Sequence, residues 1–287
     1  MTPTLTAVLQ PTGRTRRIRL GRLNSLQLGL GIVGLMAVVA VGTRFWTPYD
    51  PDASSVGPPY EAPSPAHLFG TDRVGSDVFS RTLSATTSDF GITVAAVLIA
   101  FVIGTFLGAL AGYFGGVLDA VTMRLMEVLQ AFPSLLLAML MVAAVGSGTT
   151  NVIVVVSIIG IPNYVRLVRA EILSKKNWQF AEAARMVGNS PLRILFRHLL
   201  PNSMRPLIAF SSINASWVAI IVASLGYIGL GIEPGTAEWG SMISRGQDSI
   251  LSGQWWISAF PGVAILVLSF AFYLIGDGVT ESSERRS

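Results

Sequence analysis

The sequence predicts an all-α protein embedded in a membrane, with six helices that span the bilayer. Apolar residues make up 51% of its 287 residues and charged residues only 13%, a balance typical of membrane proteins. The apolar residues also form continuous runs as long as a helix needs to cross the hydrocarbon core, about 20 residues. A transmembrane β-barrel would instead show short segments of alternating polarity. The six runs cover residues 25–46, 91–113, 123–146, 150–170, 206–231 and 256–277.

The distribution of positive charge predicts how these helices are oriented. Cytoplasmic loops are enriched in Lys and Arg relative to outer loops. With both termini in the cytoplasm, sixteen of the twenty Lys and Arg residues lie inside, and the opposite orientation would invert that ratio. The sequence therefore predicts an N-in, C-in protein whose pI of about 9.8 reflects this asymmetry rather than nucleic-acid binding. The residues left outside are Arg44, Arg73, Arg81 and Arg245.

A basic cytoplasmic tail, residues 1–24, precedes the first helix at 25–46. A twin arginine followed by an apolar run is also a feature of secretory signals. This run, however, is long for a signal and has no clear A-x-A cleavage site. We therefore predict that it is retained as a transmembrane helix.

Residues 47–90 are predicted to lie outside the membrane. Their first half is rich in Pro, which prevents a regular helix and favours an extended path. The second half predicts a helix along the membrane surface, with a contact surface for an external partner as the alternative. The apolar face of that helix comprises Val74, Val78, Phe79 and Leu83.

The other five helices form a core at residues 91–278, and a cytoplasmic tail follows at 279–287. The second helix carries three glycines at four-residue spacing. In lipid, such a row of missing side chains lets another helix backbone approach closely. We therefore predict close helix packing, within the chain or with a second subunit, at Gly104, Gly108 and Gly112.

Two features interrupt the apolar run of the third helix. Pro133 removes a backbone hydrogen bond and predicts a bend. Glu127 lies one turn from Arg124 near the inner boundary, so a structural ion pair is the favoured interpretation and a role in transport is the alternative. No predicted span carries a carboxylate, Lys or His at its centre. This disfavours a proton- or sodium-coupled transporter, or a channel, that acts alone.

The cytoplasmic loop at about 172–204 is predicted to hold two short amphipathic helices. The residues before Gly188 favour a helix, Gly188 interrupts it, and Ser190 with Pro191 restarts it as N-cap and first helical residue. Pro201 is predicted to end this unit. The apolar stripe predicted for the second helix comprises Leu192, Leu195, Phe196 and Leu199.

The loop at about 232–255 is too polar to span a membrane and is predicted to lie outside. It is expected to hold a short helix at about 242–251. Its tryptophans suit the membrane interface as anchors, with stacking on a substrate as the alternative. They are Trp239, Trp255 and Trp256.

The sequence lacks the residues that several kinds of catalytic site need. Without Cys it has no disulfide, thiolate nucleophile or Cys-ligated metal, and its two His residues, His67 and His198, predict no metal site. It has neither the G-x-x-x-x-G-K-[ST] loop of an ATPase nor the H-E-x-x-H motif of a metalloprotease. We therefore expect a chain with no catalytic residues, and an intramembrane enzyme is the least favoured class.

One segment of the cytoplasmic loop carries a specific family pattern. It resembles the EAA loop of permease subunits from binding-protein-dependent ABC importers. The matching residues are Glu182, Ala183, Ala184, Gly188, Leu200 and Pro201. Segments similar to the dipeptide and oligopeptide permeases of the C-subunit type lie at 70–81, 111–116, 131–138, 225–234, 238–243 and 260–262.

This resemblance implies the fold of type I importers, like that of the methionine importer, in the plasma (inner) membrane of a bacterium. Such a permease forms half of a translocation path beside a homologous second permease. Two cytoplasmic ATPase subunits or domains bind ATP and Mg²⁺, and an external binding protein delivers the substrate, so the chain itself needs no cofactor. The branch implies di- or oligopeptides, with nickel chelates, glutathione or haem as alternatives.

The resemblance and the loop charges together name the candidate site residues. In this family the EAA loop forms a coupling helix that seats in a cleft of the ATPase, and its arginines also suit anionic lipid. The candidates for ATPase coupling are Glu182, Ala183, Ala184, Arg185, Gly188, Ser190, Pro191, Arg193, Arg197, Leu200 and Pro201. The candidates for an external partner or gate are Asp72, Asp77, Glu238, Trp239 and Met242.

Overall fold

The computed structural model describes residues 24–233 and 235–284. The basic tail predicted at residues 1–24 lies outside the described residues except for Asn24, and so do Arg285 and Arg286 of the predicted C-terminal tail. Within the described ranges the regular elements are helices, with one isolated bridge between Thr71 and Asp77. The all-α fold that the composition predicts is therefore confirmed.

Five helices are long and apolar enough to cross a membrane, and two shorter helices form a bent pair that gives a sixth if it counts as one span. The prediction of six spans is confirmed when this pair counts as one. The long helices are α1 (Ser25–Gly42), α2 (Val78–Phe114), α5 (Thr149–Lys175), α9 (Met204–Tyr227) and α11 (Trp256–Glu284). The bent pair consists of α3 (Gly116–Gln130) and α4 (Ser134–Val145).

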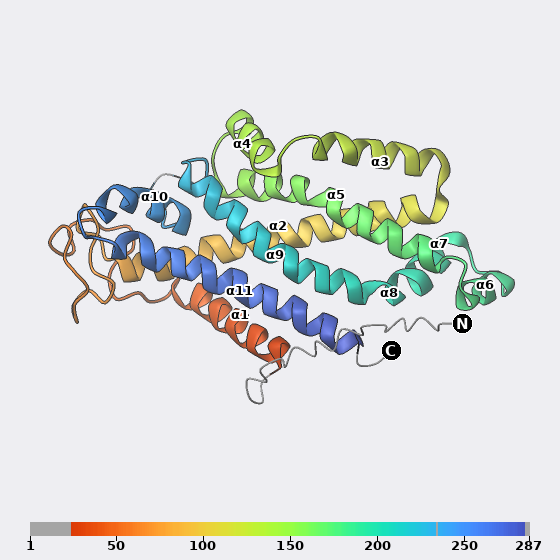
Figure 1. Cartoon of the computed structure of the whole chain (residues 1–287), viewed down its shortest axis with the longest axis horizontal. Helices are drawn as coiled ribbons and strands as arrows, with labels where there is room; N and C mark the ends of the chain where they lie inside the picture. Colours follow the sequence, from red (N-terminus) through yellow and green to blue (C-terminus); the bar gives the residue numbers. More distant parts are fainter. Residues whose placement is uncertain (1–23, 234, 285–287) are drawn as a thin grey trace, which may run out of the picture.

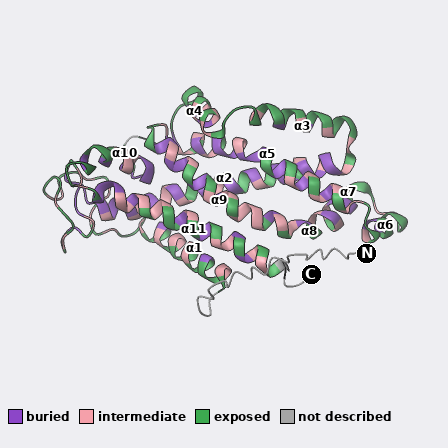
Figure 2. Ribbon diagram, viewed as in Figure 1, coloured by how far each residue is buried: buried purple, intermediate pink, exposed green. Residues whose placement is uncertain are grey.

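The long helices lie side by side in an elongated bundle (Figure 1). α2 packs along α5, and α11 packs against both α1 and α9. The segment between α1 and α2 and the short helix α10 (Trp239–Ile250) lie at one end, and a group of short helices lies at the other. Buried residues are frequent on α2 and α5, whereas α1 and α3 are mostly exposed or half-buried (Figure 2). Their apolar outer faces are suited to lipid or to another subunit.

The glycines of α2 lie where this helix packs against α5. A Cβ built on Gly108 would lie 2.5 Å from the carbonyl oxygen of Val165, and one built on Gly112 would lie 2.9 Å from that of Arg169. Gly104 faces Tyr164 in the same way. The backbones of α2 and α5 are therefore in direct contact, and these glycines serve packing within the chain.

α2 begins at Val78 and runs for 37 residues without a break. Asp77 caps it, because its Oδ2 accepts a hydrogen bond from the N–H of Ser80 at 2.7 Å. The prediction of a separate helix along the membrane surface is wrong: its residues form the first turns of α2, and Val74 lies before the helix. No Pro occurs between residues 78 and 114, so nothing ends the helix at the expected membrane boundary.

The third predicted span is broken at residues 131–133. α3 and α4 meet there at 88°. Pro133, with a ψ of 129°, directs the chain out of the helical path and has no N–H to continue the hydrogen-bond ladder. The predicted bend is thus confirmed as a full change of direction. Arg124 and Glu127 form the exposed ion pair that the sequence favoured, at 3.1 Å.

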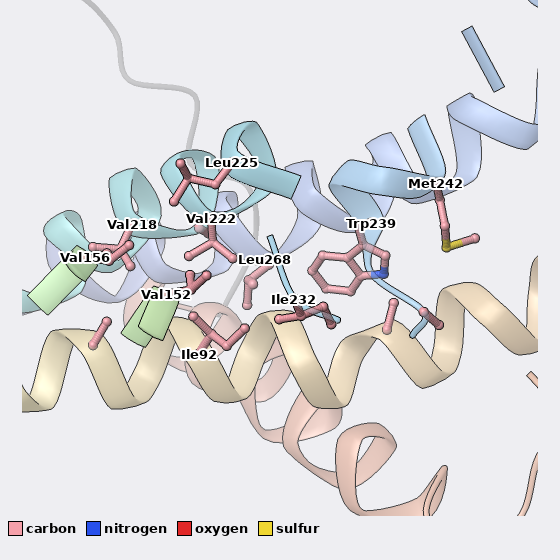
Figure 3. Close-up of a cluster of buried hydrophobic side chains, with 14 of the residues drawn as sticks. Ile92, Val152, Val156, Val218, Val222, Leu225, Ile232, Trp239, Met242 and Leu268 are labelled. Carbon is pink, nitrogen blue, oxygen red and sulfur yellow. The ribbon is translucent and has the colours of Figure 1, made fainter. Parts of the chain in front are cut away.

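A hydrophobic core at the outer end joins α2, α5, α9, α10 and α11 (Figure 3). Trp239 and Trp256 are buried in it, so their prediction as interface anchors or stacking surfaces is wrong. The indole N–H of Trp239 donates to the Thr82 carbonyl at 2.9 Å, and that of Trp256 donates to the Thr71 carbonyl at 3.1 Å. Trp255 is 52% exposed. The predicted short helix is present as α10, which the buried Trp239 begins.

Candidate functional site

The loop predicted to be cytoplasmic connects α5 to α9 through four short helical pieces at one end of the bundle (Figure 1). They are α6 (Gln179–Met186), α7 (Pro191–Arg193), the π-helix η1 (Ile194–Leu199) and α8 (Leu200–Asn202). The last three follow one another directly and α6 packs against η1, so the predicted pair of short helices is confirmed. Pro201 does not end the unit as predicted: it lies at the start of α8, and the break before α9 falls at Ser203.

Gly188 forms the turn between the two halves of the loop. Its φ is +80°, a conformation that glycine adopts without strain and that most other residues avoid. The Gly188 N–H donates to the Arg185 carbonyl at 2.9 Å. Ser190 has the extended backbone of an N-cap but makes no side-chain capping bond, and Pro191 occupies the first helical turn. The turn therefore depends on the backbone of Gly188 and Pro191 and receives no cap from the Ser190 side chain.

The inner face of the loop is buried against the ends of the membrane helices. Ala181 and Ala184 of α6 are buried together with Ile194, Leu195 and Leu199 of η1. The membrane helices α2, α5 and α9 contribute the other members of this cluster, which are Ala109, Val168, Ile172 and Leu207. The loop is therefore held by three membrane-spanning helices at once.

The π-helical geometry of η1 changes which side chains face inward. Hydrogen bonds between residues five apart place Ile194 and Leu199 on the same face. The stripe predicted for an α-helix therefore fails at Leu192, which is 55% exposed, and misses the buried Ile194. Pro201 supplies a physical reason, because it cannot donate to the carbonyl of Arg197 and its ring crowds that carbonyl. A wider turn relieves both conflicts.

Several apolar side chains of the loop are exposed next to charged ones, and Trp178 is one of them at 53%. Met186 is 89% exposed, Val187 83% and Leu192 55%, and we call these three residues the apolar tip. The other exposed coupling candidates are Glu182, Ala183, Arg185, Gly188, Ser190, Pro191, Arg193, Arg197 and Pro201, whereas Ala184 is buried and Leu200 is half-buried. Met186 and Val187 are consecutive in the chain, and contiguous exposed apolar surface is typical of contact sites.

The residues predicted to contact an external partner make their contacts within the chain or are buried. Asp77 caps α2 and pairs with the buried His67, Oδ1 to Nδ1, at 2.9 Å. Asp72 accepts two backbone N–H bonds in a turn. The other three candidates, Glu238, Trp239 and Met242, are at most 5% exposed. These positions argue against direct contact with an external partner.

Glu238 stands out as a carboxyl group enclosed by glycines. A Cβ built on Gly231 would lie 2.5 Å from its Oε2, and one built on Gly226 would overlap the carboxyl group. Burial raises the pKa of Glu238 to about 7, against the lowering effects of the Ile232 backbone N–H and of the charge on Arg245. Glu238 belongs to no cluster of three or more potential metal ligands, and none occurs elsewhere in the described ranges.

Comparison with known proteins agrees with this architecture. Residues 104–286 match the family model described as "Binding-protein-dependent transport system inner membrane component". The probable D,D-dipeptide transport system permease protein of Escherichia coli is 38% identical over 250 residues, which cover 87% of this chain and 84% of that protein. The glutathione transport system permease protein of Pectobacterium atrosepticum is 39% identical over 257 residues, covering 87% and 84%. The dipeptide transport system permease protein of Haemophilus influenzae is 33% identical over 261 residues, covering 89% and 88%.

Proposed function

Because this chain belongs to the family of binding-protein-dependent transport system inner membrane components, we propose that it is the permease for small peptides in an ATP-driven importer. Its membership makes it a multi-pass permease subunit of the inner membrane. We further propose the surface that receives the ATPase, the partners that complete the importer, and the class of substrate.

The apolar tip carries the proposal for the ATPase contact. Within the described chain, Met186 and Val187 are largely uncovered and Leu192 is 55% exposed. Covering apolar surface stabilises a complex by roughly 25 cal/mol per Å², and a polar rim commonly surrounds such a contact. The exposed side chains of Glu182 and Arg193 supply that rim. We place the ATPase here, with ATP and Mg²⁺ bound by the ATPase.

The buried inner face of the loop supports a role in transmitting motion. α6 and η1 share one hydrophobic cluster with α2, α5 and α9. Since packed cores resist compression and move as units, a displacement of the loop moves the inner ends of these helices with it. Closure of an ATPase dimer against the apolar tip would thereby switch access to the translocation path from one side of the membrane to the other.

The exposed apolar surface of α3 and α4 supports a contact with a homologous second permease. The side chains concerned are Leu125, Val128, Phe132, Leu136 and Leu140. At the outer end, residues 47–77 are suited to meet an external binding protein. Membership of the family supports both contacts.

The names of the relatives support a peptide substrate. Two of the three relatives compared above are named for dipeptide transport and one for glutathione transport. We propose di- or oligopeptides for this chain, with glutathione as the alternative. Uptake assays with the binding protein that operates with this permease would decide between them, because that protein selects the ligand.

Variants of Gly188 test the coupling role in the reconstituted importer. Gly188→Val forces a β-branched residue into a left-handed turn at a cost of roughly 1–2 kcal/mol, although no atom lies within 4 Å of the added Cβ. It should reduce ATP-driven peptide uptake and the amount of ATPase that co-purifies. Gly188→Asn should keep both, because Asn tolerates this conformation.

Gly253 provides the matched control at the outer end of the molecule. It also has a positive φ, +94°, and no neighbour within 4 Å, so Gly253→Val introduces similar strain far from the loop. It should leave ATPase attachment unchanged. Equal co-purification and uptake in Gly188→Val and wild type would contradict the coupling role, and uptake without the ATPase would indicate a transporter that acts alone.

A further inference from the structure

A groove in the middle of the bundle contains neutral amide side chains. It has a volume of about 650 Å³ and is formed by α3, α4, α5 and α9. Its polar lining includes Gln130, Ser134, Asn163 and Asn214, its aromatic walls are Phe132, Phe210 and Trp217, and no charged residue of the described chain lines it. A volume of this size is within the range of small-molecule sites, about 300–1,000 Å³.

The side-chain amides of Gln130 and Asn163 bond to each other through only one atom of each amide. Nε2 of Gln130 donates to Oδ1 of Asn163 at 3.0 Å. Neither Oε1 of Gln130 nor Nδ2 of Asn163 has a hydrogen-bond partner in the described part of the chain, and both residues are exposed to the groove. The groove therefore presents one free acceptor beside one free donor, which is the complement of the N–H and C=O of a peptide main chain.

Asn214 is held in place on the opposite wall. Its Nδ2 donates to the hydroxyl of Tyr164 at 3.2 Å, and Tyr164 is fully buried. A third amide is thus fixed toward the groove from α9. Its Oδ1 has no partner within the described ranges, and it adds another acceptor to the lining.

The break between α3 and α4 is the second observation that points to a polar occupant. Residues 131–133 are not helical, and Gln130 and Ser134 on either side of the break both line the groove. Non-helical backbone at membrane depth is stable only where protein or a water-filled cavity satisfies it, and broken helices commonly form substrate sites near the bilayer midplane. A purely apolar helix in this groove would leave the amides unpaired, at a cost.

We propose that this groove binds the main chain of the transported peptide, with Gln130 accepting from a peptide N–H and Asn163 donating to a peptide C=O. This inference rests on the proposed function as a peptide permease. Because all peptides share the same main-chain groups, a groove that binds these groups accepts many peptide side chains, and the aromatic walls contribute apolar contact. A helix of the second permease is the competing occupant that the test must exclude.

The test compares a peptide with an analogue that lacks one hydrogen-bond donor. The importer, assembled with its second permease, ATPase and binding protein in proteoliposomes, is assayed for uptake of alanyl-alanine and of its ester analogue, in which oxygen replaces the peptide N–H. Gln130→Met keeps the shape of Gln130 and removes its acceptor. The peptide-to-ester uptake ratio should fall about three- to tenfold relative to wild type, the effect of one neutral hydrogen bond.

Two controls distinguish an effect on uptake that arises at the groove from an effect that arises elsewhere in the importer. The same binding protein is present throughout, so its own preference cancels in the ratio. Ser212→Ala, on the same helix as Asn214 but outside the groove lining, should leave the ratio unchanged. An unchanged ratio in Gln130→Met would overturn the proposal. If Gln130→Met fails to assemble, Gln130→Leu takes its place, and loss of the second permease from both variants would show that the groove is a subunit contact.

If the chain is not a peptide permease, the uptake assay gives a different result. Wild-type importer would then take up neither compound, which would remove the proposed function and this inference together. Uptake of the peptide by wild type with an unchanged ratio in the variant would remove the groove assignment alone.

Discussion

The carbonyl oxygen of Ala184 accepts two hydrogen bonds from Asn189. One comes from the backbone N–H at 3.2 Å and the other from the side-chain Nδ2 at 3.0 Å. Ala184 is buried against the membrane helices, whereas the turn between the two residues is exposed. Asn189 therefore ties the exposed turn to the buried face of the loop, and this tie determines how rigidly the apolar tip is held.

Asn189→Ala should loosen the turn without unfolding the bundle. It removes one hydrogen bond, which contributes about 0.5–1.5 kcal/mol, so the backbone amides of residues 187–189 should exchange with deuterium about two- to tenfold faster. Asn177→Ala is the control, because Asn177 is an exposed amide in the same loop whose side chain makes no hydrogen bond in the structure. Equal exchange rates in the two variants would show that the side chain of Asn189 does not hold the turn.

Glu238 should make the stability of the permease depend on pH. The folded protein keeps a proton on Glu238 up to about pH 7, whereas the unfolded chain releases it near the ordinary pKa of 4.5. The folded state therefore binds more protons between these values, and stability falls as the pH rises, by up to about 1.4 kcal/mol per pH unit. The ionisable groups that face this carboxyl are Asp89 of α2, which accepts from the Trp239 N–H at 3.1 Å, and Arg245 of α10.

Glu238→Gln should weaken this dependence. Its Tm in lipid nanodiscs should exceed that of wild type by several degrees at pH 8 and approach it at pH 5. Glu233→Gln, an exposed position in the same outer loop, should follow the wild-type curve. Parallel Tm curves for Glu238→Gln and wild type from pH 5 to 8 would contradict the burial of an ionisable carboxyl at this position.

Adding a methyl group to two glycines of α2 should have opposite effects on stability. In Gly108→Ala the new Cβ meets the Val165 carbonyl of α5 at 2.5 Å, and forcing the helices apart should cost about 1–3 kcal/mol. In Gly91→Ala the new Cβ meets no atom within 4 Å, and replacing a helical glycine should stabilise by up to about 1 kcal/mol. Thermal unfolding of both variants checks this, and a destabilised Gly91→Ala or a neutral Gly108→Ala would argue against the α2–α5 contact.

The sequence predicted the features that depend on local composition. Long apolar runs placed the six spans, because a bilayer demands about 20 apolar residues per crossing. Pro133 predicted the bend in the third span, and Gly188 with Pro191 predicted the two halves of the cytoplasmic loop. Proline has a fixed φ and no N–H, and glycine adopts a positive φ without strain, so the local chemistry decides the backbone at these positions.

The features that the sequence did not predict depend on contacts between distant segments. Trp239 is buried because the polar outer loop folds back onto α2, where Thr82 and Asp89 accept its two N–H groups. The burial of Ile194 depends on the π-helical turn of η1, which shifts the inward face relative to an α-helix. The amide pair of Gln130 and Asn163 joins residues 33 positions apart, and no local sequence pattern predicts such a pair.

Thiol labelling at position 186 tests the central claim, that the apolar tip receives the ATPase. The chain contains no Cys, so Met186→Cys provides a single reporter at a residue that is 89% exposed, and Leu251→Cys provides a control at a residue that is 98% exposed at the outer end. The measurement is the maleimide labelling rate of each variant in the permease pair, with and without its ATPase. We expect the ATPase to protect position 186 strongly and to leave position 251 unchanged, whereas equal labelling of position 186 in both states would contradict the account.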